Sequence, residues 1–269
     1  MVINSLNNKK LAIGILLFIG LGLLLGLHFW TSKKSGNSLV GPQEIAEENK
    51  PSGNQSASTT TPQRQSIINI LPSYPTYQGE PIELVKGDGI EKQFPADVVK
   101  IYREELKKLA MDLSQKPGDV EGWLRVGVLK KFFNDYKGAR DAWEYLTQIA
   151  PQEARAYVNL GNLYMLYLKE YALAEARFIK AVELDSQETY FLALADLYRI
   201  YWPDHKSDVP KLIQEAIQKS GQRVNYYLYL GSFYEEQGLK SEAKKNYEQV
   251  QILQPGYPGI AESITRVSQ

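Results

Sequence analysis

The chain has 269 residues, of which 43% are hydrophobic and 11% aromatic, so it is long enough to build a sizeable core. Its 31 Lys and Arg residues balance its 31 Asp and Glu residues, so no global charge draws it to nucleic acid. It has no cysteine, which excludes disulfides, thiolate metal ligands and a lipidated-cysteine anchor.

The first predicted element is a transmembrane helix over Leu11–Trp30, after a short N-terminal tail at residues 1–10. These 20 residues carry no formal charge, and a helix of that length spans about 30 Å, the thickness of a bilayer hydrocarbon core. A cleaved signal peptide is the alternative, but its apolar region runs about 7–15 residues before a small-residue cleavage site. Here the apolar run is longer and Lys33 and Lys34 follow it, which favours an uncleaved, single-pass anchor.

Lysines on the two sides of this helix set its expected orientation. The amino terminus with Lys9 and Lys10 gives +3 on one side, against +2 from Lys33 and Lys34 on the other. The positive-inside rule therefore predicts a cytoplasmic N-terminus and an extracytoplasmic domain beyond the helix.

Residues 31–65 are predicted to be a disordered linker. Small and polar residues dominate there, and such a segment buries too little apolar surface to offset its ordering entropy. A flexible chain of about 30 residues has an r.m.s. reach of roughly 30 Å, so the segment acts as a tether. Residues 66–95 follow as an extended segment that contains proline and glycine but is too apolar for a simple linker. We expect it to dock on the domain that follows.

Residues 96–269 are predicted to form a helical domain with an internal repeat. A small residue recurs with spacings of 34, 34 and 36, and an aromatic residue lies four positions before it each time. The small residues are Gly127, Gly161, Ala195 and Gly231, and the aromatic residues are Trp123, Tyr157, Phe191 and Tyr227. Tyrosine lies three positions after the small residue in three units, whereas Lys130 takes this position in the first unit.

A second helix is expected in each unit, with an apolar stripe whose members are spaced by four and then three residues. The stripes are Ala139–Trp143–Leu146, Ala174–Phe178–Ala181, Val209–Ile213–Ala216 and Ala243–Tyr247–Val250. Glycine in a helix interior costs about 1 kcal/mol relative to alanine, so its recurrence needs a reason. We expect the two helices to approach closely there, with the small first member of each stripe as the partner of the glycine.

This pattern resembles the tetratricopeptide repeat family, whose signature is W-x2-L-G-x2-Y, then A-x3-F, then P over 34 residues. The resemblance covers about residues 120–255 and implies an all-α solenoid of about four helical hairpins with flanking helices. The expected repeats span about 120–153, 154–187, 188–223 and 224–257, with a closing helix at about 258–268. Unit two carries one extra residue near Leu168–Glu170, and unit three carries two around Trp202–Asp208.

No catalytic, cofactor or metal site is expected. The chain has no P-loop, Rossmann glycine pattern, H-E-x-x-H or calcium loop. His205 has no second histidine beside it for a zinc site, because the other histidine, His28, lies in the apolar run. Asp204 and Ser207 flank His205 in one inserted loop, whereas the members of a catalytic triad normally converge from distant segments. The sequence therefore argues against an enzyme.

The remaining candidate is a surface that binds a protein or peptide. In the tetratricopeptide family, the first helices of successive repeats line a concave groove that holds a peptide. The residues at these positions, with two nearby arginines, are Leu124, Val158, Leu192, Leu228, Val128, Asn162, Asp196, Ser232, Arg155 and Arg199. Family members that clamp a terminal carboxylate carry Lys and Asn where this chain has Leu124 and Val128, so that binding mode is not expected. The apolar row of Leu124 and its equivalents either lines the groove or packs the first helices together, and the sequence leaves both open.

The expected function is a membrane-tethered adaptor or assembly factor that presents this groove to a protein or peptide partner. A self-associating structural subunit of a membrane complex, and hence a homo-oligomer, is the alternative. Nucleic acid is not an expected partner, because 23 basic residues meet 24 acidic ones after Pro95 and no basic stripe stands out.

Overall fold

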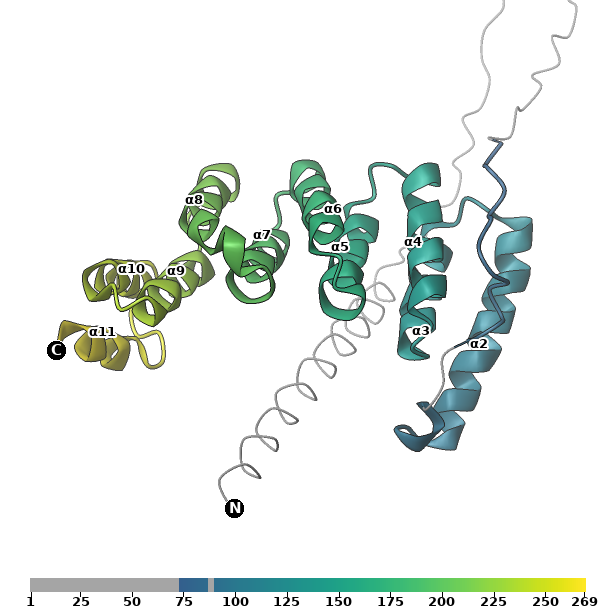
Figure 1. Ribbon diagram of the computed structural model, residues 1–269, viewed down its shortest axis with the longest axis horizontal. Coiled ribbons are helices and arrows are strands. Elements are labelled where there is room, and N and C mark those ends of the chain that lie inside the picture. The colour runs from purple at the N-terminus through teal and green to yellow at the C-terminus, as the bar shows by residue number, and fades with distance from the viewer. Residues whose placement is uncertain (1–72, 87–89) are drawn as a thin grey trace, which may run out of the picture. The chain divides into compact units, whose positions relative to one another are not determined.

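The computed structural model describes residues 73–86 and 90–269, and in this part of the chain it contains ten α-helices and no β-strand (Figure 1). The helix expected at residues 11–30 and the linker expected at residues 31–65 lie outside the described residues. Within the described ranges, no helix has both the length and the apolar character that a membrane crossing requires.

The helices form four consecutive pairs, with one further helix at each end of the row (Figure 1). The pairs are α3 (Val120–Phe132) with α4 (Tyr136–Ile149), α5 (Ala154–Leu163) with α6 (Tyr171–Leu184), α7 (Glu188–Asp196) with α8 (Val209–Ser220), and α9 (Val224–Glu236) with α10 (Lys240–Leu253). A short 3-10 helix, η2 (Ile90–Lys92), and then α2 (Ala96–Gln115) precede the first pair, and α2 packs on α3. The last helix, α11 (Ile260–Ser268), packs on α10.

Acidic side chains begin several of these helices. Asp119 accepts a hydrogen bond from the backbone N–H of Gly122 at the start of α3, and Asp135 accepts one from the N–H of Gly138 at the start of α4. Each cap satisfies one of the N–H groups that the first turn of a helix leaves without a partner.

The extra residues of units two and three are absorbed at the ends of their first helices. Helix α5 continues into a π-helical turn, η3 (Tyr164–Leu168), and α7 continues into a second one, η4 (Leu197–Tyr201). A π-turn holds one more residue per hydrogen-bonded ring than an α-turn, so it takes up an inserted residue without shifting the helix before it. In unit three a 3-10 helix, η5 (Pro203–Asp208), accommodates the remaining insertion.

Glycine in the first helix of a pair faces an aromatic ring of the second helix. A Cβ atom built on Gly161 would lie 2.6 Å from the ring of Phe178, closer than real Cβ atoms approach other atoms. The same pairing joins Gly127 to Trp143 and Gly231 to Tyr247. The expected close approach is therefore present, but the expected partner is wrong: the nearest atoms belong to the ring of Phe178 rather than to Ala174.

The third pair shows the same relationship with both members changed. Ala195 stands where the other first helices have glycine, and Ile213 stands where the other second helices have an aromatic ring. Both side chains are completely buried. A methyl group on the first helix thus accompanies a smaller, aliphatic side chain on the second, which keeps the filled volume similar.

Tyrosines tie the second pair to the first and the third pair to the second. The hydroxyl of Tyr164 donates a 3.1 Å hydrogen bond to Glu144 of α4, and the hydroxyl of Tyr198 donates a 2.6 Å hydrogen bond to Glu175 of α6. Each bond thus links the end of a first helix to the second helix of the preceding pair.

Residues 73–86, which we call the strap, have no regular helix or strand and dock on the first pair. The Tyr77 ring lies 4.8 Å from the Trp123 ring of α3 and 5.4 Å from the Tyr145 ring of α4. The hydroxyl of Tyr145 also donates a 2.8 Å hydrogen bond to the carbonyl oxygen of Pro75. The docking expected of residues 66–95 is thus seen in their described part.

Candidate functional site

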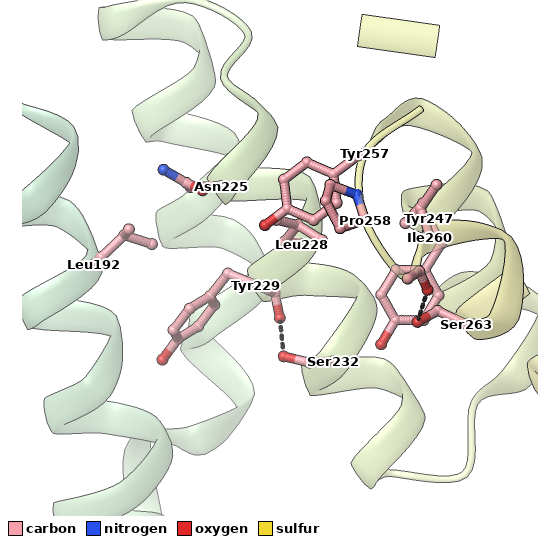
Figure 2. A pocket seen from close by; sticks show the side chains of 11 residues that line it. Leu192, Asn225, Leu228, Tyr229, Ser232, Tyr247, Tyr257, Pro258, Ile260 and Ser263 are labelled. Atoms are coloured by element: carbon pink, nitrogen blue, oxygen red, sulfur yellow. Dashed lines mark hydrogen bonds between the residues drawn. The ribbon is translucent and has the colours of Figure 1, made fainter. Parts of the chain in front are cut away.

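A groove with a volume of about 570 Å³ lies between α7, α9 and α11 (Figure 2). Figure 2 shows Leu192 of α7 on the left, Leu228 and Tyr229 of α9 in the middle, and Ile260 of α11 on the right. The other lining residues are Asn225, Ser232, Tyr247, Tyr257, Pro258, Gly259 and Ser263. The lining is therefore aliphatic and aromatic, with amide and hydroxyl groups interspersed.

The turn between α10 and α11 builds one wall of this groove. Gly256 and Gly259 have φ angles of +81° and +77°, in the left-handed region that glycine adopts at little cost. These two residues turn the chain back after α10 and place Tyr257 against the groove. No side chain stands close to where a Cβ would be on Gly259, so only its backbone conformation requires glycine there.

Helix α11 is held against α9 by one carboxylate. Glu235 accepts a 2.6 Å hydrogen bond from Nε of Arg266 and a 2.7 Å hydrogen bond from the hydroxyl of Tyr247. The Arg266 guanidinium is the main cause that lowers the pKa of Glu235, so this carboxylate stays ionised under ordinary conditions. Ile260 and Val267 are buried on the inner face of α11, so burial and this ion pair together fix the wall.

A hydrogen-bonded network joins α7 to α9 beside the groove. The hydroxyl of Tyr229 donates a 2.8 Å hydrogen bond to Asp196, and the guanidinium of Arg199 lies 4.9 Å from the centre of the Tyr229 ring. The same guanidinium donates hydrogen bonds to Ser232 Oγ at 3.1 Å and to Glu236 Oε2 at 3.0 Å. The arginine thus fixes the tyrosine, the serine and the carboxylate at one end of the groove.

Burial raises the pKa of Asp196 above its usual value, although its hydrogen bond from Tyr229 and the charge of Arg199 act in the opposite direction. Burial also raises the pKa of Tyr229, and the negative charge of Asp196 adds to that effect. The pair therefore shares a poorly solvated environment at the edge of the groove.

The structure brings five of the ten residues predicted for the binding surface to this region. Leu192, Leu228 and Ser232 line the groove, and Asp196 and Arg199 form the network beside it. Two of the apolar row, Leu192 and Leu228, are only half-buried.

The other five predicted residues do not line the groove. Leu124 is buried, and its carbonyl oxygen accepts a 3.2 Å hydrogen bond from the Trp143 indole. Arg155 is exposed and forms ion pairs with Glu121 and Glu153, each at 2.7 Å. The remaining three are half-buried and lie on α3 and α5: Val128, Val158 and Asn162. In the apolar row, the first member, Leu124, is therefore part of the core, whereas the last two members, Leu192 and Leu228, line the groove.

Sequence reasoning missed Tyr229, Asn225 and the residues of the last turn. Tyr229 follows Leu228 directly, so reading one more position of each first helix would have found it. The run Pro255–Gly259 has two glycines around a Tyr-Pro dipeptide, which is a turn signal.

The chemistry of the lining is that of a binding surface. Amide and hydroxyl groups can bond to the main chain of a bound peptide, and the leucine, isoleucine and tyrosine side chains can cover its apolar groups. Over the described ranges, no three His, Cys, Asp or Glu side chains gather closely enough to hold a metal ion.

Comparison with known proteins gives matches at the level of the repeat. Residues 154–188 and 224–257 match the model of the tetratricopeptide repeat family. Among curated proteins, no sequence matches the chain.

Two solved structures are similar to part of the chain. YrrB, described as a TPR protein with an unusual peptide-binding site, is 16% identical with a TM-score of 0.44, over 59% of this chain and 81% of that one. PilF of Pseudomonas aeruginosa is 21% identical with a TM-score of 0.41, over 64% of this chain and 78% of that one. Helices α2 to α11 form an all-helical solenoid of the tetratricopeptide repeat type, in which two segments match the family model.

Proposed function

We propose that this protein is a membrane-tethered adaptor or assembly factor that holds a protein or peptide partner in the groove between α7, α9 and α11. The observation that carries the proposal is the lining of that groove. Half-buried Leu192 and Leu228 stand beside exposed Asn225, in a concave site of about 570 Å³. Sites of this size, mainly apolar with a few fixed polar groups, are where proteins bind ligands.

The expected partner segment presents apolar side chains to the leucines and its main chain to the polar groups. Burial of apolar surface contributes about 25 cal/mol per Å², so covering a few leucine and tyrosine side chains supplies most of the driving force. The side chains of Asn225, Ser232 and Ser263 can bond to peptide N–H and C=O groups at the rim. The tetratricopeptide match at residues 154–188 and 224–257 supports a protein–protein interaction as the general role.

The membrane-tethered part of the proposal rests on the sequence of residues 11–30 and their lysine flanks. In this arrangement the N-terminus is cytoplasmic and the helical domain extracytoplasmic. The protein should stay with membranes after carbonate washing, and a cysteine placed in residues 31–65 should react with an impermeant reagent added outside intact cells. Release by carbonate would contradict the anchor, and labelling only after lysis would contradict the orientation.

A crosslinking pull-down with matched variants tests the groove. Leu228→Glu and Leu192→Glu each place a charge in the lining, and Asn225→Trp fills the rim from an exposed position without touching the core. All three should lose the partner. Ile252→Glu is the matched control, because Ile252 lies outside the groove and is 67% exposed. It should keep the partner.

Val158→Glu separates the groove from the longer apolar row. Val158 occupies the same helical position as Leu192 but does not line the groove, so this variant should keep the partner. Helical circular dichroism and melting curves must stay close to those of the unmodified protein for each variant counted. Retention of the partner by the folded Asn225→Trp and Leu228→Glu proteins would refute the groove. Recovery of only a second copy of this chain would favour the self-associating alternative.

A further inference from the structure

Lys130 is a completely buried lysine whose charge is held by the strap. Its ammonium group donates a 3.1 Å hydrogen bond to the carbonyl oxygen of Pro81 and a second hydrogen bond to that of Leu84. It also lies 3.2 Å from the carboxylate of Asp135, which is itself buried. A buried charge is tolerated only when it is paired and hydrogen-bonded, so Lys130 requires the strap to be in place.

The exception in the repeat pattern now has a physical reason. Later pairs carry a tyrosine at this position, and Tyr164 and Tyr198 reach a glutamate on the second helix of the pair before. No helical pair precedes α3 and α4 within the described residues. Lys130 instead meets a turn of the strap. The carbonyl oxygen of Pro81 accepts a 3.1 Å hydrogen bond from the backbone N–H of Leu84 as well as one from Lys130, and the carbonyl oxygen of Leu84 accepts a second bond from Lys130.

Aromatic side chains hold the other end of the strap. Tyr77 packs between Trp123 and Tyr145, and Gly79 leaves room for the Tyr77 ring where any Cβ would collide with it. Gly118, in the turn before α3, leaves room for Tyr74 in the same way. Ile82 is buried further along the strap.

The solenoid recognises the strap through side-chain donors and apolar pockets, and the carbonyl groups it bonds belong to Pro75, Pro81 and Leu84. Such contacts require a peptide with aromatic residues at set positions before a turn like Pro81–Leu84, but they require no covalent continuity with α2.

We propose that the first helical pair carries a second peptide-binding site, distinct from the groove between α7, α9 and α11. Its ligand is a peptide of the pattern Tyr-x3-Pro-Ile that turns at the proline as Pro81–Leu84 do, and the strap of the chain itself occupies the site. A competing peptide of the same pattern displaces the strap and so frees residues 73–86 from the first pair.

The test uses the full chain with a specific protease site placed between Lys86 and Ile90. After folding and cleavage in detergent, the helical fragment is captured by a C-terminal tag. The amount of N-terminal fragment captured together with it is then measured. The fragments should stay together, and an excess of synthetic peptide comprising residues 70–86 should release the N-terminal fragment. Chains carrying a second tag, added instead of the peptide, show whether the strap of another copy exchanges into the same site.

Variants of the strap test which of its side chains retain the N-terminal fragment. Tyr77→Ala should weaken retention at least tenfold, because it empties the aromatic pocket. Tyr77→Phe should retain the fragment as well or about fivefold better, because the Tyr77 hydroxyl is buried with no hydrogen-bond partner. Glu83→Ala is the control, since Glu83 is exposed, and it should leave retention unchanged.

Three results would overturn the proposal. One is separation of the fragments while the helical fragment stays folded by circular dichroism. Another is a fragment that no excess of peptide releases, which would make the strap a fixed part of the core. The third is loss of helical structure on cleavage, which would have the same meaning.

Discussion

The hydroxyl of Tyr229 donates a 2.8 Å hydrogen bond to the carboxylate of Asp196, and this bond joins the first helices of the third and fourth pairs beside the groove. Asp196 is half-buried, and burial raises its pKa. The ionised carboxylate is therefore less favourable in the folded protein than in the unfolded chain. The bond positions Tyr229 in the groove, but burial of the ionised Asp196 carboxylate lowers the stability of the folded protein.

The variant Asp196→Asn should reveal this loss of stability, because its free energy of unfolding relative to the unmodified protein should depend on pH. An acid whose pKa is raised by folding stabilises the fold most when it is protonated, and that contribution is lost as pH rises from its ordinary value near 3.8 through the raised value. The asparagine amide oxygen still accepts from Tyr229 but carries no charge. The free energy of unfolding of Asp196→Asn relative to the unmodified protein should therefore increase between about pH 4 and pH 7.

Urea unfolding at a series of pH values measures this difference. Tyr229→Phe is the control, because it removes the donor and keeps the carboxylate, so it should destabilise the fold more at neutral pH than at acid pH. A difference between Asp196→Asn and the unmodified protein that is constant with pH would mean that Asp196 is well solvated.

Gly161 and Phe178 should behave as one unit in a double-mutant cycle. Gly161→Ala gains about 1 kcal/mol of helix propensity but forces a methyl group into the Phe178 ring, and overpacking of a core costs about 1–3 kcal/mol. We expect a net loss of stability. The double variant Gly161→Ala/Phe178→Ile has the same two residue types as Ala195 and Ile213 in the third unit. It should therefore recover much of the stability that Gly161→Ala loses.

Thermal and urea melting of the two single variants and the double variant give the coupling energy between the sites. Gly161→Leu sets the scale, because it adds more volume at the same place and should destabilise more than Gly161→Ala. Additive effects of Gly161→Ala and Phe178→Ile would show that the methyl group and the ring do not meet.

The repeat could be predicted from the sequence because each helix shows its buried face as a spacing. Ala174, Phe178 and Ala181 are four and three residues apart, and all three are completely buried in α6. The partner of Gly161 could not be predicted in the same way, because the spacing identifies the face of a helix and not which of its members lies opposite a given residue. The Phe178 ring is large enough to reach Gly161, and this contact is seen only when both helices are placed in three dimensions.

The site was harder to predict than the fold for a related reason. Leu124 and Leu228 hold equivalent positions in their helices, yet the first is core and the second lines a groove. Their surroundings differ because a turn and α11 enclose the last pair, whereas α2 and the strap cover the first. Periodicity within one repeat carries no information about such end effects.

Gly259 offers a test of the wall that encloses the groove. Its φ of +77° is strained for a residue with a Cβ, and the space around it is open, so Gly259→Ala should cost about 1–2 kcal/mol through the backbone alone. Asparagine tolerates the left-handed region better, so Gly259→Asn should cost less. Equal melting temperatures for the two variants would show that the turn relaxes to another conformation.

The half-buried carboxylate of Glu144 should act as the junction of the first and second pairs. It accepts hydrogen bonds from Arg177 at 2.8 Å and from Tyr164 at 3.1 Å, so Glu144→Ala leaves two donors without a partner and should cost about 1–3 kcal/mol. Burial, and then the charge of Glu144, raises the pKa of Tyr164 to about 12. Glu144→Gln removes that charge and should lower the pKa of Tyr164, while burial keeps it above the ordinary value of 10. Phenolate absorbance during an alkaline titration, with Tyr164→Phe subtracted, measures the shift, and an unchanged pKa in Glu144→Gln would contradict the assigned contact.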